Sequence, residues 1–451
     1  MRTLRLQRLR SVPLCRSTKQ VLTAKLTAEA SKARATAASV PNTTRVLTFT
    51  TRLFSRTLWT VAYVTSGGIT GCGLRGRPRR PVRGGVTTRP YTSRIAVAYT
   101  GYSSDVISRI KGLLGDSFAG IYDKIGKDTP IEDIMAARDA ARACKADVII
   151  AVGGGSVVQG GRVLAILLAE KGAPGELCTQ YPEFGNAISP KLLEKKLPII
   201  NVLTMATSAQ NRGGSPVKQG GYRLEFFDPK TSPAALIWDA DALMTAPDSM
   251  VRNSATSFVW RSAMDMGYTK TTPLSHYSRK MIFDMISGTL PRLNTPEARI
   301  ELCIATYLQN REASDGGTRT NHWAGRVVYA FSTSIFNMFD HVGQGEARAA
   351  LCPTVMRHLG PRDPECMCRI AKALGVWKEG DPVDQAHLRA ADELRRIFDS
   401  LGMPKTLGDI KVPRDAAPVL LENSLKNFNA DPKREFVKER DLLEKVLNDC
   451  W

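Results

Sequence analysis

The chain has 451 residues, of which 43% are hydrophobic and 24% are charged. This length and composition allow two hydrophobic cores and exclude a chain that is disordered throughout. The net charge of +20 suggests nucleic-acid binding at first sight, but 19 of the 63 Lys and Arg residues lie up to Arg94, beside the single acid Glu29. The rest of the chain has 44 basic and 42 acidic residues, so the folded body gives no general electrostatic reason to bind nucleic acid.

The basic N-terminal segment is rich in Arg, Ser and Thr, and in its first ten residues leucines alternate with arginines. This composition is typical of a mitochondrial presequence; the alternatives are a basic tail without a targeting role and a cytoplasmic protein. Residues 46–65 are moderately apolar but contain Arg52 and Arg56, so we expect no membrane-spanning helix. Residues 67–94 have the composition of a flexible linker.

The nine cysteines show no paired Cys-x-x-Cys spacing, and Cys366 and Cys368 are too isolated to supply four zinc ligands. We therefore expect reduced, mostly structural thiols. Such cysteine usage agrees with an intracellular or matrix compartment.

Strand and helix patterns alternate after the basic segment. Residues 95–99 read as a strand, and residues 105–114 and 130–145 read as helices. For the second helix we expect Thr129 as the N-cap, Pro130 at the first helical position and Glu132 as the carboxylate of a capping box.

An apolar run over residues 146–152 ends in Gly153, Gly154, Gly155 and Ser156, and residues 157–169 are apolar at helical spacing. This pattern predicts a buried strand, a glycine turn and a helix. Glycines let a backbone approach a pyrophosphate, and the start of a helix favours its negative charge, so the turn suggests dinucleotide binding; an ordinary tight turn is the alternative. The spacing matches neither the P-loop nor the Gly-x-Gly-x-x-Gly fingerprint, which implies a less common nucleotide fold.

A strand over residues 197–203 leads into Thr204 and Ser208 at its carboxyl end, where open α/β sheets bind ligands, and residues 234–239 form the last clear strand. Long amphipathic helical segments follow, at residues 254–266, 275–290, 296–312, 386–401 and 435–447. The sequence thus predicts an α/β nucleotide-binding domain followed by an all-α domain. We expect a presequence and linker over residues 1–92, the NAD(P)-binding domain over 93–242 and the helical domain over 243–451, with the site in a cleft between the two domains.

The order of these segments resembles the iron-containing (group III) alcohol dehydrogenase family, whose relatives include glycerol dehydrogenase, maleylacetate reductase and dehydroquinate synthase. The resemblance is carried by motifs at residues 146–162, 203–211, 228–247, 345–353, 401–404 and 429–433. It implies the two-domain architecture of dehydroquinate synthase and an NAD(P)-dependent oxidoreductase that interconverts a small-molecule carbonyl and an alcohol. We also expect a homo-oligomer.

By this resemblance the glycine turn would hold the cofactor pyrophosphate, and Arg223 would stand where the family keeps a Lys beside the cofactor. An acid that would bind the ribose of NAD is replaced by Thr100 and Gly101, so NADP is permitted as well as NAD. Gln159, Arg162 and Asn211 replace a family Asp, Lys and Glu. The implied cofactor-binding residues are Gly153, Gly154, Gly155, Ser156, Gln159, Thr204, Ser208 and Arg223.

The family's metal ligands, an Asp and three His, are not found at their expected positions. The resemblance places Phe258, Ser262 and Gln344 at three of them and the fourth near Ala330. Phe and Ala cannot coordinate a metal, and Ser and Gln are poor neutral ligands, so we expect no bound catalytic metal.

Without a metal, a hydrogen-bond donor must stabilise the developing oxyanion. His341 is the first candidate for this acid or donor, although a partly exposed histidine at a helix end without a catalytic role is an equally acceptable interpretation. Gln344 is a further candidate, because it stands where the resemblance places the last metal-binding His. His322 is the second histidine candidate.

Two hypotheses remain open. The first is a metal-independent NAD(P)-dependent oxidoreductase. The second is a catalytically inactive family member that serves as a structural subunit of an organelle complex, and it is motivated by the loss of every recognisable ligand together with the changes at Gln159 and Asn211. The retained glycine turn, Thr204 and Arg223 favour the enzyme.

Overall fold

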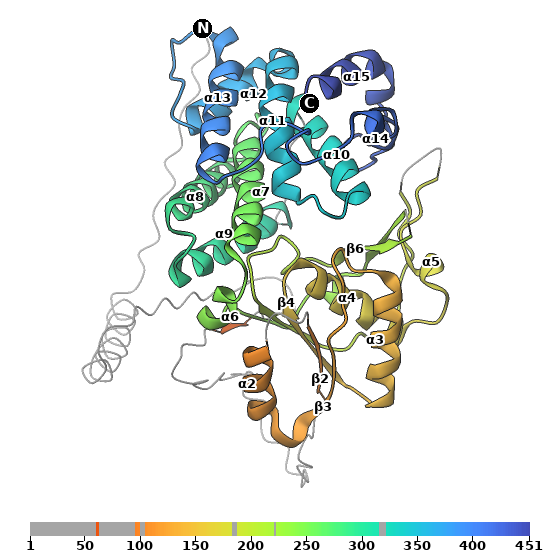
Figure 1. The fold of residues 1–451 in the computed structure, drawn as a ribbon. Coiled ribbons are helices and arrows are strands. Elements are labelled where there is room, and N and C mark those ends of the chain that lie inside the picture. The colour runs from red at the N-terminus through yellow and green to blue at the C-terminus, as the bar shows by residue number, and fades with distance from the viewer. Residues whose placement is uncertain (1–59, 63–94, 100–103, 183–186, 221, 315–321) are drawn as a thin grey trace, which may run out of the picture. The chain divides into compact units, whose positions relative to one another are not determined.

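The computed structural model describes residues 60–62, 95–99, 104–182, 187–220, 222–314 and 322–451. Within this part of the chain a parallel sheet covered by helices comes first, and a body built from helices follows (Figure 1). The expected fold class, an α/β domain followed by an all-α domain, is confirmed.

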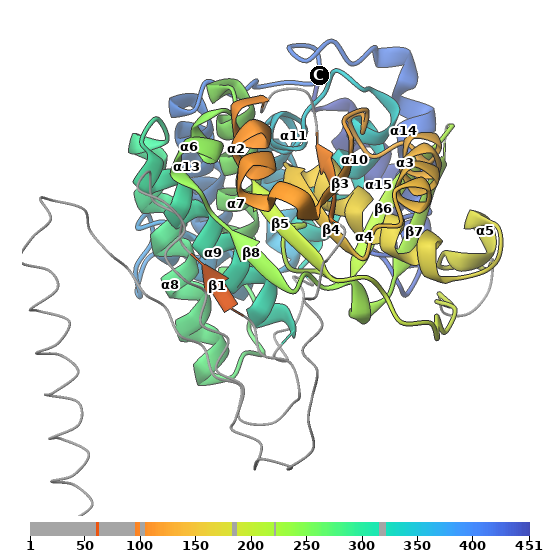
Figure 2. The same ribbon diagram turned by 90° about the horizontal axis from the view of Figure 1, so that it is seen from below.

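Six parallel strands form the main sheet, in the order β1-β8-β5-β4-β2-β3 (Figure 2). Strand β4, at the centre of this order, is the apolar run that precedes the glycine turn. The strands span Thr60–Ala62 (β1), Ile95–Tyr99 (β2), Phe118–Tyr122 (β3), Val148–Gly153 (β4), Ile199–Leu203 (β5) and Ala235–Ile237 (β8).

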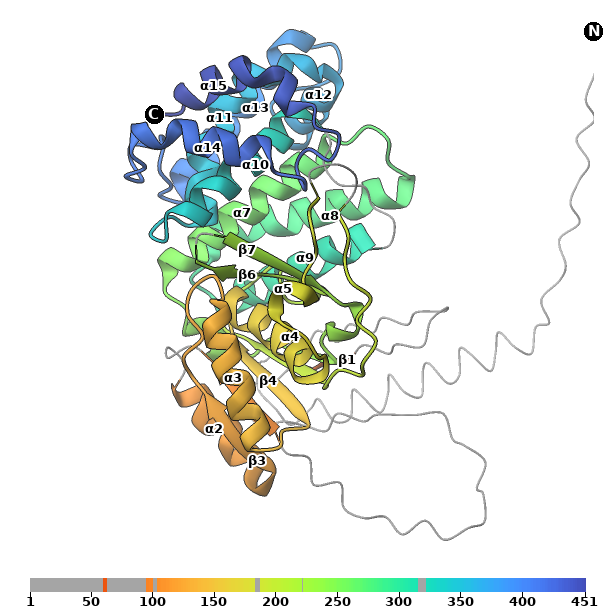
Figure 3. The same cartoon turned by 90° about the vertical axis from the view of Figure 1, so that its right-hand side faces the viewer.

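Both faces of β4 are covered, which explains its continuous apolar sequence. Ile149 and Ala151 face the core that contains α3 (Ile131–Ala143) and α4 (Gly155–Ala169), which pack side by side (Figure 3). Ile150 and Val152 face the opposite core, built with α2 (Ser104–Leu114) and α6 (Ala240–Met244). The alternation of a strand therefore places successive residues in two different cores.

A separate antiparallel hairpin lies beside the sheet. It consists of β6 (Gly214–Gln219) and β7 (Tyr222–Phe227), and a short helix, α5 (Pro174–Leu177), precedes it in the chain. The backbone N–H of Lys218 in β6 donates to the carbonyl of Thr129, which ties the hairpin to the start of α3.

Amphipathic helices make up the second half of the described chain, as their periodicity predicts. The neighbours α7, α8, α9, α10 and α11 pack against one another around a shared apolar core. The helices span Asp248–Met266 (α7), Pro273–Thr289 (α8), Pro296–Ser314 (α9), Trp323–Met338 (α10), Gln344–Leu359 (α11), Pro364–Ala373 (α12), Ala386–Ser400 (α13), Ala417–Leu425 (α14) and Arg440–Asn448 (α15).

The expected capping box at the start of α3 is wrong. Pro130 occupies the N-cap and no side chain caps the helix. The Thr129 hydroxyl instead donates to the carbonyl of Ser156 at 2.9 Å, and Glu132 is exposed. The Thr129 hydroxyl therefore binds α4, and it does not cap α3 as the local sequence predicts.

Most of the expected presequence and linker lies outside the described residues, as does Thr100-Gly101. Three residues of that segment, Thr60–Ala62, pair with β8, so the sheet includes part of the chain that precedes position 93. In the described part of the chain, no helix has the length and apolar character needed to cross a membrane.

Candidate active site

The turn between β4 and α4 leaves no room for side chains. A Cβ atom added to Gly153 would lie 2.7 Å from Cγ2 of Val157, one added to Gly154 would lie 3.0 Å from Sδ of Met205, and one added to Gly155 would lie 3.2 Å from Oγ1 of Thr207. Gly154 is the N-cap of α4, so the amide groups of its first turn begin at this glycine turn. A glycine backbone at a helix start suits a pyrophosphate group.

The loop after β5 forms the other wall of this turn. The backbone N–H of Thr204 donates to the carbonyl of Gly153 at 3.2 Å, so the two strand ends are adjacent, as expected for neighbouring parallel strands. Met205 and Thr207 lie against the glycines themselves, whereas the resemblance implies Thr204 and Ser208 as the cofactor-binding residues of this loop. Their position directly after a strand was the signal that could have identified them.

A strained segment packs against Ser156. Asp128 and Thr129 have φ angles of 59° and 60°, in the left-handed region that non-glycine residues rarely adopt. The backbone N–H of Asp128 donates to the Ser156 hydroxyl at 3.0 Å, and the Thr129 hydroxyl lies 3.4 Å from Oε1 of Gln159. The contacts with α4 hold this conformation in place, and they occupy the side chains of both Ser156 and Gln159.

The loop between α10 and α11 is fastened to the sheet half of the molecule. The Lys127 ammonium donates to the carbonyl of Asp340, and Lys218 forms an ion pair with the Asp340 carboxylate at 2.6 Å. The hydrogen bond from Lys218 is the main cause that lowers the pKa of Asp340. A series of contacts, from Ser156 to Asp128 and from Lys127 to Asp340, thus connects the glycine turn with the segment that carries His341 and Gln344.

His341 and Gln344 are both exposed. Nε2 of His341 lies 3.0 Å from the carbonyl oxygen of Ile410, which requires this nitrogen to donate. Gln344 is the first residue of α11. His341 thus lies in the loop just before α11 and Gln344 at the start of that helix. One ring nitrogen of His341 is already bonded to the carbonyl of Ile410.

Arg223 lies on β7 and is half-buried. Its guanidinium carbon is 5.5 Å from the ring centre of Phe336 in α10. Burial lowers the pKa of Arg223, while the charge of Asp128 opposes this effect. The cation therefore lies near the same Asp128 segment that contacts Ser156.

Arg162, at the position of a family Lys, has a structural role here. Its side chain is fully buried, and Nε donates to the Ser215 hydroxyl at 2.7 Å while Nη2 donates to the carbonyl of Gly214 at 3.0 Å. Nη1 donates to the carbonyl of Ala209 at 2.5 Å. Burial lowers the pKa of Arg162 to about 9. These bonds hold the loop between β5 and β6 against α4.

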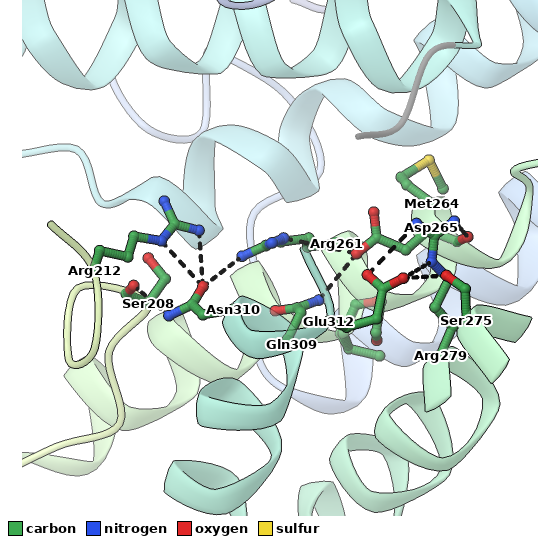
Figure 4. A network of polar contacts seen from close by, with 12 residues as sticks. Ser208, Arg212, Arg261, Met264, Asp265, Ser275, Arg279, Gln309, Asn310 and Glu312 are labelled. Carbon is green, nitrogen blue, oxygen red and sulfur yellow. Dashed lines mark hydrogen bonds and ion pairs between the residues drawn. The ribbon is translucent and has the colours of Figure 1, made fainter. Parts of the chain in front are cut away.

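The other end of that loop is attached to α9 (Figure 4). The Asn310 amide donates to the carbonyl of Ser208 at 2.7 Å and to Oδ1 of Asn211 at 2.7 Å. Arg212 and Arg261 both donate to Oδ1 of Asn310, at 2.9–3.0 Å and 3.3 Å. Asn211, which replaces a family Glu, thus joins the sheet half to the helical half.

A small pocket lies where the two halves meet. Its walls come from the loop after β5 and from helices α7 and α9, and its volume of about 10 Å³ has room for about one water molecule. The lining residues are Met205, Ala206, Val251, Ser254, Arg299 and Leu302.

The four residues that the resemblance places at the family's metal positions do not fit a divalent cation. Phe258 and Ala330 are buried in the apolar core, and the Ser262 hydroxyl donates to the carbonyl of Val259 in its own helix. Gln344 is exposed and neutral. Among the residues that the structure describes, no group of three or more His, Cys, Asp or Glu side chains could hold a metal ion.

The second histidine candidate, His322, caps a helix. Nδ1 of His322 accepts from the backbone N–H of Gly325 at 3.2 Å, and Nε2 lies 3.3 Å from the carbonyl of Met264, which it reaches as a donor. Burial lowers the pKa of His322. Both ring nitrogens are therefore used to fix the start of α10.

Comparison with known proteins identifies the family of the chain. The family model of the iron-containing alcohol dehydrogenases matches residues 85–240, and that of the C-terminal region of the Fe-containing alcohol dehydrogenase family matches residues 271–447. The chain is similar to maleylacetate reductase of Burkholderia cepacia, with 21% identity over 80% of this chain and 90% of that protein. It is also similar to long-chain-alcohol dehydrogenase 1 of Geobacillus thermodenitrificans, with 24% identity over 68% of this chain and 75% of that protein.

Among solved structures, that of a 1,3-propanediol oxidoreductase superposes with a TM-score of 0.66 and 17% identity, covering 79% of this chain and 92% of that one. The fold and the site together define a nucleotide-dependent oxidoreductase. The chain belongs to the iron-containing alcohol dehydrogenase family, whose members use NAD(P).

Proposed function

We propose that this protein interconverts a carbonyl compound and an alcohol with NAD or NADP, and that it does so without a divalent metal. Two observations together support the proposal. The glycine turn packs closely against Met205 and Thr207, and the side chains of Phe258 and Ser262 cannot bind a metal.

The residues of this chain have distinct roles in the proposed reaction. The amide groups at Gly154 and Gly155 bind the pyrophosphate, and Arg223 adds a positive charge beside the cofactor. When bound, the nicotinamide donates or accepts the hydride. The Gln344 amide is the proposed hydrogen-bond donor to the oxygen of the substrate, which becomes negatively charged as hydride arrives. Nε2 of His341 already donates to the carbonyl of Ile410, so His341 can supply a second donor, its Nδ1–H, only as the imidazolium.

The first experiment is a titration of the full chain with NADH and NADPH, followed by nicotinamide fluorescence, on protein whose metal content has been measured and which has been treated with a chelator. Micromolar binding by metal-free protein supports the proposal. Absence of binding by protein that circular dichroism shows to be folded favours the inactive structural subunit instead.

A matched pair of glycine variants makes this experiment specific. Gly153→Ala should weaken cofactor binding at least about tenfold, because its methyl group would lie 2.7 Å from Val157, whose β-branched side chain has little freedom on α4. Gly112→Ala is the control, since no atom lies within 4 Å of the added methyl group. Equal affinities in the two variants would contradict the assignment of the turn.

The basic N-terminal segment carries a further proposal, that it directs the protein to mitochondria. Its support is composition alone, with one acidic residue, Glu29, up to Arg94. Fusion of residues 1–92 to a fluorescent reporter tests it, and a reporter that remains in the cytosol would refute it.

A further inference from the structure

Arg348 on α11 is buried without a counter-charge among the described residues. Its side chain is 9% exposed, and its Nε has no hydrogen-bond partner. No carboxylate of the described residues forms an ion pair with it. A buried guanidinium without a counter-charge is unfavourable for folding, so its presence calls for a compensating role.

The surroundings of Arg348 contain an aromatic ring and a second cation. Its guanidinium carbon lies 4.6 Å from the ring centre of Trp260 on α7. The pKa of Arg348 is lowered to about 10, mainly by burial; Tyr329 raises it, the charge of Arg261 lowers it, and no acidic side chain contributes. Arg261 itself donates to the neutral oxygen of Asn310 and forms an ion pair with Asp265 at 3.7 Å, in the network of Figure 4.

Arg348 is also close to the proposed active site. It lies one helical turn after Gln344 on α11, so the two side chains share a face of that helix. Tyr329 on α10 acts electrostatically on both Arg348 and Arg223, which places it near both guanidinium groups. Arg223 is the residue proposed beside the cofactor, and Tyr329 precedes Ala330, one of the positions that lacks a metal ligand.

We propose that Arg348 binds a carboxylate group of the substrate. The substrate would then be a keto or aldehyde acid, or the corresponding hydroxy acid, whose carboxylate supplies the counter-charge that the protein lacks. A guanidinium suits this task because its parallel N–H groups match the two oxygens of a carboxylate. The inference deepens the proposed function and rests on it for the identity of the ligand as a substrate.

Calorimetric titration of the full chain with malonate and succinate, compared with their dimethyl esters, tests the anion site in the absence of cofactor. We expect the dicarboxylates to bind and the neutral esters not to bind. Arg348→Gln should weaken dicarboxylate binding at least about tenfold, whereas Arg357→Gln, which removes an exposed cation from the same helix, should leave it unchanged.

Thermal unfolding separates this role from a structural one. Because Arg348 has no ion-pair partner, Arg348→Gln should match or exceed the wild-type Tm without ligand, and it should lose the rise in Tm that malonate gives to the wild type. Arg348→Lys retains the charge and should keep part of that rise. Should Arg348→Gln fail to fold, the wild-type preference for dicarboxylates over their esters still decides the question.

Three results would overturn the proposal. The first is wild-type protein that binds no carboxylate, and the second is an Arg348→Gln variant that binds malonate normally. The third is inorganic phosphate that binds in place of malonate and competes with NADPH, which would assign Arg348 to a phosphate of the cofactor. Failure of NADH and NADPH to bind would refute the proposed function, yet carboxylate binding would remain measurable.

Discussion

Replacing Gln210 by Leu should weaken the connection between the loop after β5 and helix α9. Gln210 is fully buried, and its amide nitrogen donates to the carbonyl of Cys303 at 2.9 Å and to the Thr306 hydroxyl at 2.7 Å. Its amide oxygen accepts from Nε1 of Trp238 at 2.9 Å. Leu fills a similar volume, so the change removes three hydrogen bonds and leaves little cavity.

The three lost bonds are not equivalent. The carbonyl of Cys303 keeps the Thr306 hydroxyl as a donor at 3.1 Å, whereas the Trp238 N–H loses the acceptor that Gln210 provides. Loss of an acceptor for a buried donor costs about 1–3 kcal/mol, and the other lost bonds add about 1 kcal/mol. We expect Gln210→Leu to lower the free energy of unfolding by about 2–4 kcal/mol.

Urea unfolding followed by circular dichroism measures this loss, with Gln219→Leu, at an exposed position that ends β6, as the control that should change stability by less than about 0.5 kcal/mol. Combining Gln210→Leu with Trp238→Phe removes both members of the pair. The double variant should therefore be more stable than the sum of the single changes predicts, by about 1–2 kcal/mol. Additive losses, or a loss below about 0.5 kcal/mol for Gln210→Leu, would refute the reasoning.

Two further predictions concern a histidine and a strained lysine. Because burial lowers the pKa of His322, the unfolded chain takes up a proton below its pKa of about 6.5 before the folded protein does, so stability should fall as the pH drops below that value. His322→Asn, which can still cap α10, should flatten this part of the pH profile of the urea midpoint; an unchanged slope between pH 7.5 and 5.5 would contradict the assignment. Lys145 is exposed and has a φ of 52° just after α3, so Lys145→Gly should raise the free energy of unfolding by about 1 kcal/mol in the same urea assay. Lys145→Ala retains the strain and should give no such gain, so equal effects of the two changes would show that the backbone conformation is not the cause.

The strand, turn and helix around Gly153 were predictable because their signals are local. An apolar run, three consecutive glycines and a helical periodicity lie within about twenty residues, and each needs information from its own neighbours alone. The long helices of the second half were predictable for the same reason. The prediction that Phe258 and Ser262 bind no metal also needs the sequence alone, since a side chain that cannot bind a metal does not acquire that ability by folding.

The expected cap at Thr129 shows where local reasoning ends. A hydroxyl before a helix can serve the helix end or any other acceptor that the fold brings near, and here the carbonyl of Ser156 is that acceptor. His322 is an example of the opposite kind: the sequence suggests it as a catalytic candidate, but in the structure it is buried and caps α10. In both cases packing between distant segments decided the use of a polar group.

Sequence by itself determined the order of strands and helices and the glycine turn, because periodicity and turn residues are properties of the chain; the loss of the family's metal ligands stays a prediction. Tertiary structure alone decided that Met205 and Thr207 line that turn, that Gln210 joins it to α9, and that Arg348 is buried without a counter-charge. These contacts join segments up to 96 residues apart, as between Gln210 and Thr306. No local pattern encodes them, because burial and hydrogen-bond partners depend on which surfaces meet when the sheet and the helices pack.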